Sequence, residues 1–451
     1  MLGVLRDRTY RHLFLAQVVS LVGTGLLTVA LGLLAFRIAG DRAGAVLGTA
    51  LAVKMTAYVG IAPVAQAFSH RLPRRAFLVA MDVVRAAVAL LLPFVSAVWE
   101  VYALIFVLQA ASAAFTPTFQ ATIPEVLADE KDYTRALSLS RLAYDLENLT
   151  SPALAAALLT VIGFHWLFAG TVVGFLCSAA LVLSVRLPAP PPSNRAGGIY
   201  DRTTRSARIF LSTPRLRGLL ALNLSVAAAG AMVIVNTVVI VRAALGRPEA
   251  DVALALGAFG GGSMMAALLL PRLLDRVSDR AVMLPASAFL GILLLACAGA
   301  LTGAGWQGAA WAWPALLATW GLLGAGYSAV QTPTGRLLRR SAAADDRPAL
   351  FAAQFALSHA AWLLTYPLAG WLGASVGLGI TLAVLGGLSL AGSALAAFLW
   401  PALDPEVVAH AHLNLPAGHP HWRDHPGHGL SHAHPFLIDD LHPTWPVARA
   451  G

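Results

Sequence analysis

Hydrophobic segments of about 20 residues recur along the first 400 positions of the chain and alternate with short polar stretches. An α-helix needs about that length to cross the hydrocarbon core of a bilayer. The pattern therefore predicts an all-α membrane protein with twelve transmembrane helices. The predicted spans cover residues 14–36, 45–68, 76–98, 101–122, 136–162, 165–185, 218–241, 252–271, 281–302, 311–333, 349–374 and 377–400.

The fifth predicted span carries a group of polar and charged residues near its middle, all on one half of the helical wheel, while leucines fill the other half. A charged side chain at the centre of a membrane helix costs about 2.5 to 3.5 kcal/mol, so we expect this face to line a polar substrate or proton path. The group consists of Arg141, Tyr144, Asp145, Glu147 and Asn148.

Two of these residues have a candidate partner within the helix. Arg141 and Asp145 are four residues apart, so they can form an ion pair or contact a substrate, and the sequence leaves both open. Glu147 has no such partner on its strip of the helix. We expect Glu147 to be the carboxylate that takes up a proton or binds a cation.

Composition supports the membrane assignment and excludes several other classes. The chain is 58% hydrophobic and 12% charged, with a mean hydropathy of +0.72, whereas soluble proteins average about 25% charged. The formal charge of +9 is spread over short loops, which gives no nucleic-acid-binding patch. The sequence has no phosphate-binding G-x-x-x-x-G-K-[ST] motif, so we do not expect ATP hydrolysis. It also has no set of residues typical of a catalytic site, so we expect no other enzymatic activity and no cofactor.

Basic residues predict the orientation of the chain. The only lysines or arginines in the loops that would lie outside the cell are Arg37, Arg42, Arg242 and Arg247. By the positive-inside rule, both termini are cytoplasmic in a multi-pass protein of the plasma (inner) membrane. The expected units are an N-terminal six-helix bundle (1–185), a cytoplasmic linker (186–217) that contains PAPPPSNRAGG, a C-terminal six-helix bundle (218–400) and a His-rich cytoplasmic tail (401–451).

The two halves of the chain share short motifs in the same order. HRLPRR follows the second span and DRVSDR follows the eighth, Thr-Pro-Thr ends the fourth and the tenth, and a proline lies late in the fifth and the eleventh. This order predicts an internal duplication, as in many secondary transporters. The alignment places Gln354 and His359 opposite Tyr144 and Asp145. For His359, a packing role and a role in transport are both open.

These features resemble the major facilitator superfamily over about residues 10–400. The family's loop signature, approximately G-x-x-x-D-R-x-x-R-R, is matched by Arg71, Arg74 and Arg75, and its second-half counterpart is matched by Asp275, Arg276 and Arg280. The resemblance implies two six-helix bundles, alternating access and a gate formed by these loops.

Two positions depart from the signature. His70 replaces the acidic gate residue and Gln66 replaces the glycine. Histidine can support such a gate only weakly or in a pH-dependent way. Within the superfamily, the stretch ATIPEVLADEKDYTRALSLSRLAYDLENLTSPAL and the tail resemble the nickel-resistance exporter branch, near the drug-proton antiporters.

The tail after Trp400 is rich in histidine, with nine of the 13 histidines after residue 409. In an extended chain, histidines two residues apart face the same way and can chelate a metal. Neutral imidazole suits nickel, cobalt, zinc or copper(II), and the tail has no cysteine. The alternative is a disordered, pH-responsive tail without a ligand. The candidate ligands are His410, His412, His419, His421, His425, His428, His432 and His434.

Together these features predict a secondary exporter of a divalent cation, nickel or cobalt, by proton antiport. Asp145 and Glu147 would bind the cation, with His359 as a further candidate, and protons would replace it on the same groups. A second interpretation is a proton-coupled exporter of hydrophobic drugs or siderophores. A third, from another class, is a membrane-anchored metal-binding or sensing module in which only the tail acts.

Overall fold

The computed structural model of the chain describes most of the residues outside the fifth predicted span, the linker and parts of the tail. The described residues are 2–69, 73–127, 129, 132, 136, 139, 140, 143, 150, 151, 153–187, 207–274, 276–304, 309–342, 347–405, 407–412, 415, 421, 422, 431–439 and 441–446.

Every predicted span except the fifth coincides with one helix, which confirms the all-α fold. The fifth span lies mostly outside the described residues. The helices are α1 (Arg8–Ala39), α2 (Ala43–Ser69), α3 (Arg74–Leu91), α4 (Val98–Val126), α6 (His165–Leu183), α8 (Pro214–Val239), α9 (Glu249–Leu274), α10 (Asp279–Ala304), α11 (Ala312–Gln331), the short α12 (Thr334–Arg339), α13 (Arg347–Ser375) and α14 (Leu378–Leu399).

The third span ends earlier than hydropathy predicts. Helix α3 stops at Leu91, a single 3-10 turn covers Leu92–Phe94, and α4 begins at Val98. Pro93 has no backbone N–H to continue the α-helical hydrogen bonds. The next helix then starts with a side-chain cap, because Glu100 Oε2 accepts hydrogen bonds from the N–H groups of Ser96 and Ala97, both at 2.9 Å.

The surface of the helical part suits a lipid environment. Among the described residues, eight stretches are long and apolar enough to span a membrane, and the first of them runs over both α1 and α2. Large apolar side chains point outward, for example Phe94, Val161 and Phe398 with 80%, 78% and 83% of their surface exposed. Their exposure is expected of residues that face acyl chains rather than water.

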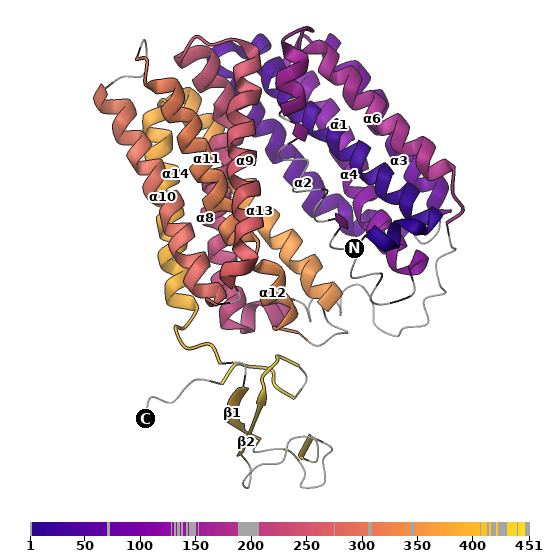
Figure 1. Cartoon of the computed structure of the whole chain (residues 1–451), viewed down its shortest axis with the longest axis vertical. Helices are drawn as coiled ribbons and strands as arrows, with labels where there is room; N and C mark the ends of the chain where they lie inside the picture. The colour runs from indigo at the N-terminus through magenta and orange to yellow at the C-terminus, as the bar shows by residue number, and fades with distance from the viewer. Residues whose placement is uncertain are drawn as a thin grey trace.

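The helices form two groups that pack side by side (Figure 1). One group contains α1, α2, α3, α4 and α6, and the other contains α8, α9, α10, α11, α13 and α14. The main contact between the groups is made by α2 and α13. The start of α1 lies at the lower end of the first helix group in Figure 1, and the tail lies below the second; we call this end the tail side and the opposite end the far end.

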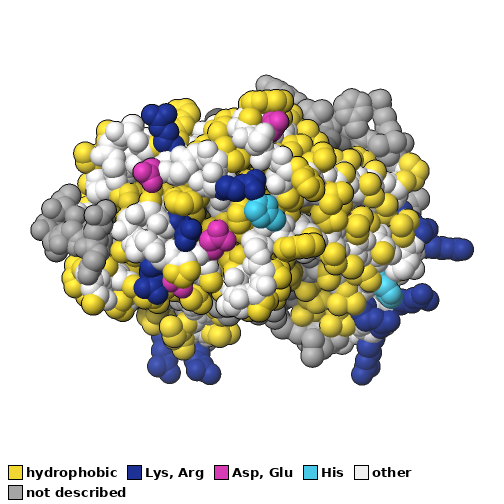
Figure 2. Space-filling model, turned by 90° about the horizontal axis from the view of Figure 1, so that it is seen from above, with side chains coloured by type: hydrophobic (Ala, Val, Ile, Leu, Met, Phe, Trp, Pro, Cys, Tyr) yellow, Lys and Arg dark blue, Asp and Glu magenta, His cyan; other side chains and the backbone are white. Residues whose placement is uncertain are grey.

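Helices α2 and α13 meet backbone to backbone near the far end. A Cβ atom on Gly370 would lie 2.2 Å from the carbonyl oxygen of Gly44, and a Cβ on Gly48 would lie 2.5 Å from the carbonyl oxygen of Tyr366. Only glycine permits such an approach. The far end of the molecule carries few, scattered charges (Figure 2).

Two hydrogen bonds lie at this contact: one joins the two helix groups, and the other holds α13 to α8 within the second group. Trp371 Nε1 of α13 donates to Thr49 Oγ1 of α2 at 3.0 Å. Asn236 Nδ2 of α8 donates to the carbonyl oxygen of Ala369 at 3.0 Å. We call the glycine contact together with these bonds the far-end seal.

The tail contains a small antiparallel sheet below the ends of α8, α12 and α14 (Figure 1). Strand β1 (Val407–Ala411) pairs with β2 (Ser431–Pro435), and His410 lies opposite His432. The pairing brings together two histidine-bearing segments about 20 residues apart in sequence. The described part of the tail therefore contains regular structure in its two paired strands.

Candidate functional site

The predicted substrate path is only partly visible. Arg141, Tyr144, Asp145, Glu147 and Asn148 lie outside the described residues, and their roles stay predictions. Of the two α13 candidates, Gln354 is buried and its Nε2 donates to Asn223 Oδ1 of α8 at 3.4 Å. This bond joins α13 to α8, so the side chain of Gln354 packs within the second helix group.

His359 lies where the two helix groups meet. Its ring stands edge-on to Tyr58 of α2, with ring centroids 5.5 Å apart, and lies 4.0 Å from the ring of Phe355. Nδ1 of His359 is 2.6 Å from the carbonyl oxygen of Phe355. Because a carbonyl only accepts, Nδ1 is the donor, and Nε2 of the neutral ring is left as an acceptor for a proton or a ligand.

An ammonium group accompanies these rings. Lys54 of α2 has its Nζ 5.5 Å from the centroid of Tyr58, in cation–π geometry. Asp82 of α3 is not its partner, because this carboxylate is buried, pairs with Arg85 of its own helix and accepts a hydrogen bond from Ser178 at 2.8 Å. The described part of the path thus offers a cation, an imidazole and aromatic faces.

The predicted gating loops are also partly described. His70, Arg71 and Asp275 lie outside the described residues. Arg74 is buried at the start of α3, and Arg75 donates to the carbonyl oxygen of Leu183 in α6. The Arg75 bond holds the start of α3 against α6 of the same helix group.

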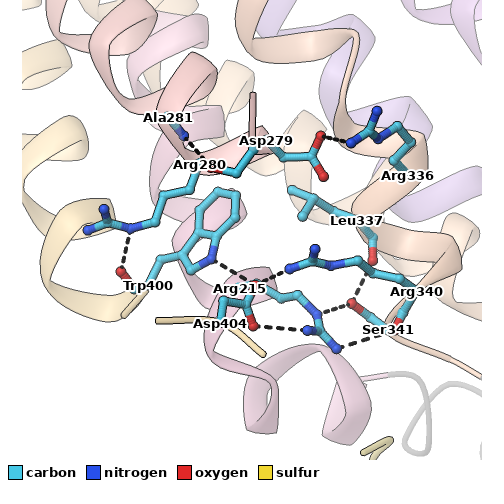
Figure 3. Close-up of polar contacts among 11 residues, drawn as sticks. Arg215, Asp279, Arg280, Ala281, Arg336, Leu337, Arg340, Ser341, Trp400 and Asp404 are labelled. Atoms are coloured by element: carbon cyan, nitrogen blue, oxygen red, sulfur yellow. Dashed lines mark hydrogen bonds and ion pairs between the residues drawn. The ribbon is translucent and has the colours of Figure 1, made fainter. Parts of the chain in front are cut away.

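The second-half loop makes a fuller set of contacts. Arg276 lies in the turn after α9 and its backbone N–H donates to Leu273. Arg280 Nε donates to the carbonyl oxygen of Trp400 at 2.9 Å (Figure 3). Asp279, which sequence analysis did not single out, forms an ion pair with Arg336 at 3.1 Å.

The most developed cluster of ligand-type side chains lies in the tail. Each of five histidines offers one ring nitrogen, and these nitrogens all lie within 4.8 Å of one another. Four of the five side chains are buried. The five are His410, His421, His432, His434 and His442, which we call the five-histidine centre.

Hydrogen bonds fix the tautomers of three of these rings. Nδ1 of His410 donates to the carbonyl oxygen of Val408 at 3.0 Å, and Nδ1 of His434 donates to that of Pro435 at 2.8 Å. Nδ1 of His442 donates to Asp439 Oδ1 at 2.8 Å. In each neutral ring, Nε2 is then unprotonated. Metal-binding histidines are oriented by such bonds.

The Nε2 atoms face one another across the centre. Those of His410 and His442 are 3.1 Å apart, and those of His421 and His432 are 2.9 Å apart. Since both His410 and His442 use Nδ1 as the donor, two neutral rings would present two acceptors to each other. A cation between them, either a proton or a metal ion, removes this conflict, so the residues fit a metal ion.

The environment of two tail histidines favours the neutral imidazole. Burial, reinforced by the neighbouring histidines, lowers the pKa of His412 and of His432 to about 4. Neutral imidazole is the form that binds metal. Nε2 of His412 is buried and has no hydrogen bond to any described residue.

The sequence anticipated most of the described centre. His410, His421, His432 and His434 are in it. His412 lies beside it, with its ring centroid 4.8 Å from that of His421, while His419, His425 and His428 lie outside the described residues. His442 was missed as a ligand. The signal that could have found it is Asp439, placed three residues before it to orient its ring.

Comparison with known proteins gives a family and a fold. The Major Facilitator Superfamily profile matches residues 13–239 and 219–433. The chain is 26% identical over 209 residues to the uncharacterized MFS-type transporter YvqJ of Bacillus subtilis strain 168, covering 45% of this chain and 48% of that protein. It is 26% identical over 152 residues to macrolide efflux protein A of Enterococcus faecalis, and this match covers 32% of this chain and 47% of that protein. The chain thus spans about half the length of the curated relatives it matches.

Solved structures share the architecture at low sequence identity. The D-xylose-proton symporter has a TM-score of 0.63 at 15% identity, covering 88% of this chain and 97% of that one. A mutant of the nucleoside transporter NupG has a TM-score of 0.61 at 13% identity, and the match covers 87% of this chain and 100% of that one. A bacterial homologue of the human lysosomal transporter Spinster, in an inward-facing conformation, has a TM-score of 0.60 at 13% sequence identity. The match covers 87% of this chain and 94% of that one. At this identity the likeness shows the fold alone.

Proposed function

The chain belongs to the Major Facilitator Superfamily, and on that premise we propose that it is a secondary exporter that moves a divalent metal cation, nickel or cobalt, outward in exchange for protons. The superfamily membership makes it a multi-pass membrane transporter rather than an enzyme. Similarity to a macrolide efflux protein supports the outward direction. The charge bias of the loops supports a plasma-membrane protein with both termini in the cytoplasm.

The observation that carries the choice of a metal is the five-histidine centre. Its five nitrogen donors exceed the four ligands of a closed structural zinc site. Imidazole donors without thiolate suit borderline divalent ions such as nickel and cobalt. The centre lies outside the helix groups, so its role is to collect or sense the cation, and the transport route runs elsewhere.

For the route itself, we propose the polar face of the fifth span together with His359. Asp145 and Glu147 would hold the cation, and Nε2 of His359 is available as an additional ligand because its Nδ1 is already bonded. Competition between protons and the metal ion for these groups couples the two fluxes. Arg141 would balance one of the two carboxylates.

A second candidate function has its own support. The positive charge of Lys54 would repel a metal cation bound near His359. The rings of Tyr58 and Phe355, with centroids 6.0 Å apart, suit an apolar organic molecule. An exporter of hydrophobic drugs or siderophores would use the fifth-span carboxylates for proton coupling only. Similarity to the macrolide efflux protein agrees with this alternative.

Transport by the purified protein distinguishes these functions. In vesicles with an imposed pH gradient, we expect nickel or cobalt movement that depends on the gradient and stops when a protonophore collapses it. Gradient-driven movement of a macrolide or a lipophilic dye without metal movement would support the drug exporter. No gradient-dependent movement of nickel or cobalt would contradict the proposed function.

Removal of residues 405–451 separates transport from a role confined to the tail. A transporter with an accessory tail should keep exporting metal with a shifted concentration threshold. A membrane-anchored metal-binding or sensing module should lose metal tolerance completely when the tail is absent.

A further inference from the structure

We propose that metal binding at the five-histidine centre is coupled to a latch that fastens the tail to the tail-side ends of α8, α12 and α14, so that the metal regulates the transporter. This inference rests on the proposed function in one respect, the presence of metal in the tail. The latch itself is a set of contacts between the tail and the second helix group. It gives the tail an effect on the transporter that goes beyond collecting metal.

The polar half of the latch is centred on Asp404, four residues after Trp400 (Figure 3). Asp404 accepts a hydrogen bond from Arg215 Nη1 at 3.0 Å and forms a second ion pair with Arg340. Trp400 Nε1 also donates to Asp404, at 3.1 Å. One carboxylate thus joins the start of α8, the residue after α12 and the end of α14.

Contacts from several elements converge on Arg215 at the start of α8. Its side chain is 2% exposed, and its Nε donates to Ser341 Oγ at 2.8 Å. Its Nη2 donates to the carbonyl oxygen of Arg340 at 3.2 Å. A buried guanidinium must have its donors satisfied, so this geometry is held firmly as long as Asp404 stays in place.

The apolar half of the latch comes from the segment that follows β2. Phe436 and Ile438 are 3% and 2% exposed and belong to the same hydrophobic core as Trp400 and Leu216 of α8. Burial of two large side chains stabilises the docked tail by the hydrophobic effect. The tail is therefore packed against the helix group and is not merely tethered to it.

A chain of direct contacts joins the metal ligands to Arg215. The ring of Phe436 lies 4.8 Å from that of His410 and 4.8 Å from that of His442. Phe436 in turn lies 5.1 Å from Trp445. The Trp445 ring lies 5.1 Å from the guanidinium carbon of Arg215. The path from a ligand to the membrane helix thus passes through two aromatic rings.

Metal binding acts on this path because it fixes the positions of its ligands. His442 and Trp445 are three residues apart, so holding His442 against His410 restricts where Trp445 can lie. In the absence of a cation, the facing Nε2 atoms of these two histidines oppose each other. Metal occupancy should therefore favour the docked position of Trp445 over Arg215.

The latch acts on the helix best placed to influence both groups. Helix α8 lies in the most buried candidate membrane span among the described residues, Pro214–Ala244, whose apolar stretch is 89% buried. It packs against α10, α13 and α14 of its own group and also contacts α1 and α2. A contact that stabilises one position of α8 therefore biases the equilibrium between transport conformations.

Thermodynamic linkage supplies the test. If metal binding stabilises the docked tail, then docking of the tail must raise metal affinity by the same factor. A change at Trp445, which is not a metal ligand, should therefore alter metal affinity. We expect Trp445→Ala in the full-length protein to weaken nickel binding about tenfold, within the range typical of coupled sites, with the stoichiometry unchanged. Trp445→Phe, which keeps a ring over Arg215, should bind nearly as well as the parent.

The matched control is Leu441→Ala, in the same segment. Leu441 is 38% exposed and lies next to His442. Its replacement should leave nickel affinity unchanged. A loss of affinity in Leu441→Ala as large as that in Trp445→Ala would show a general loosening of the tail and would overturn the proposal.

Hydrogen exchange gives a second measurement that does not depend on transport. Adding nickel chloride to the purified parent protein should slow amide exchange at residues 209–219, and this effect should be absent in Trp445→Ala. Unchanged exchange in the parent overturns the latch. Linked binding without any metal transport in vesicles would keep the latch and reject the proposed export of metal, so the two failures are distinguishable.

Discussion

Replacement of Gly370 by alanine tests whether the glycine contact between α2 and α13 closes the far end of the molecule. The new Cβ would lie 2.2 Å from the carbonyl oxygen of Gly44 and 3.1 Å from Cα of Ala45. These are backbone atoms, which cannot rotate away as a flexible side chain can. An ordinary contact would require the two helices to separate by about 1 Å in the closed state.

The cost follows from the size of this overlap. Overpacking of a well-packed interface costs about 1 to 3 kcal/mol. The cost applies only to the conformation in which the far end is closed, because the contact is absent when the helix groups separate there. The variant should therefore shift the conformational equilibrium toward the far-end-open state by about 5-fold to 150-fold.

Thiol labelling can measure this shift. In a background without Cys177 and Cys297, a reporter Ala43→Cys places a thiol beside Gly44, at a position that is fully buried when the far end is closed, so a membrane-impermeant maleimide reaches it only when the seal opens. Labelling should be faster in Gly370→Ala by at least several-fold. The control is Gly387→Ala in α14, where a new Cβ would meet no atom within 4 Å. Equal labelling rates in parent and Gly370→Ala, with normal transport, would refute the reasoning.

Three further predictions concern the transport route and the tail. Glu147→Gln should lower gradient-driven nickel transport in vesicles at least tenfold while nickel binding by the tail is unchanged; normal transport would move the coupling site to another residue. Asp439→Ala should weaken nickel binding about 10-fold to 100-fold in calorimetry, because it removes the acceptor that orients His442. The pKa of His412 and of His432 is about 4, below the ordinary value of 6.5, so the unfolded tail binds more protons between these pH values. Proteolysis of the metal-free tail should therefore accelerate as the pH falls from 6.5 to 4, and a rate independent of pH would contradict this.

Hydropathy predicted the helices well because, in a bilayer, an apolar segment must satisfy its own backbone hydrogen bonds and a helix does so locally. The largest difference in a helix end among the described spans, at α3, came from counting apolar residues through Pro93. The seal between Gly48 and Gly370 could not be predicted in the same way. A glycine in a membrane helix shows that close approach is possible, but the partner helix depends on the packing of the whole chain.

The tail shows a similar limit of sequence reasoning. Composition indicated a metal-binding role, and spacing suggested that neighbouring histidines act in pairs. The structure places one such pair, His432 and His434, in the centre, but it also joins His410 to His442 and His421 to His432, which are 32 and 11 residues apart. The docking of Trp445 on Arg215 was equally inaccessible, because an arginine at the start of a membrane helix indicates only topology when the sequence alone is considered.

The far-end seal also bears on how fast the transporter can cycle. Most interfaces lose side-chain conformational entropy when they close, at up to about 2 kcal/mol for each long side chain. Glycine has no side chain to immobilise, so Gly44, Gly48 and Gly370 bring α2 and α13 together without that entropic loss. Closing and reopening then require no change of rotamer at these positions. A contact of this kind is suited to being made and broken in every turnover.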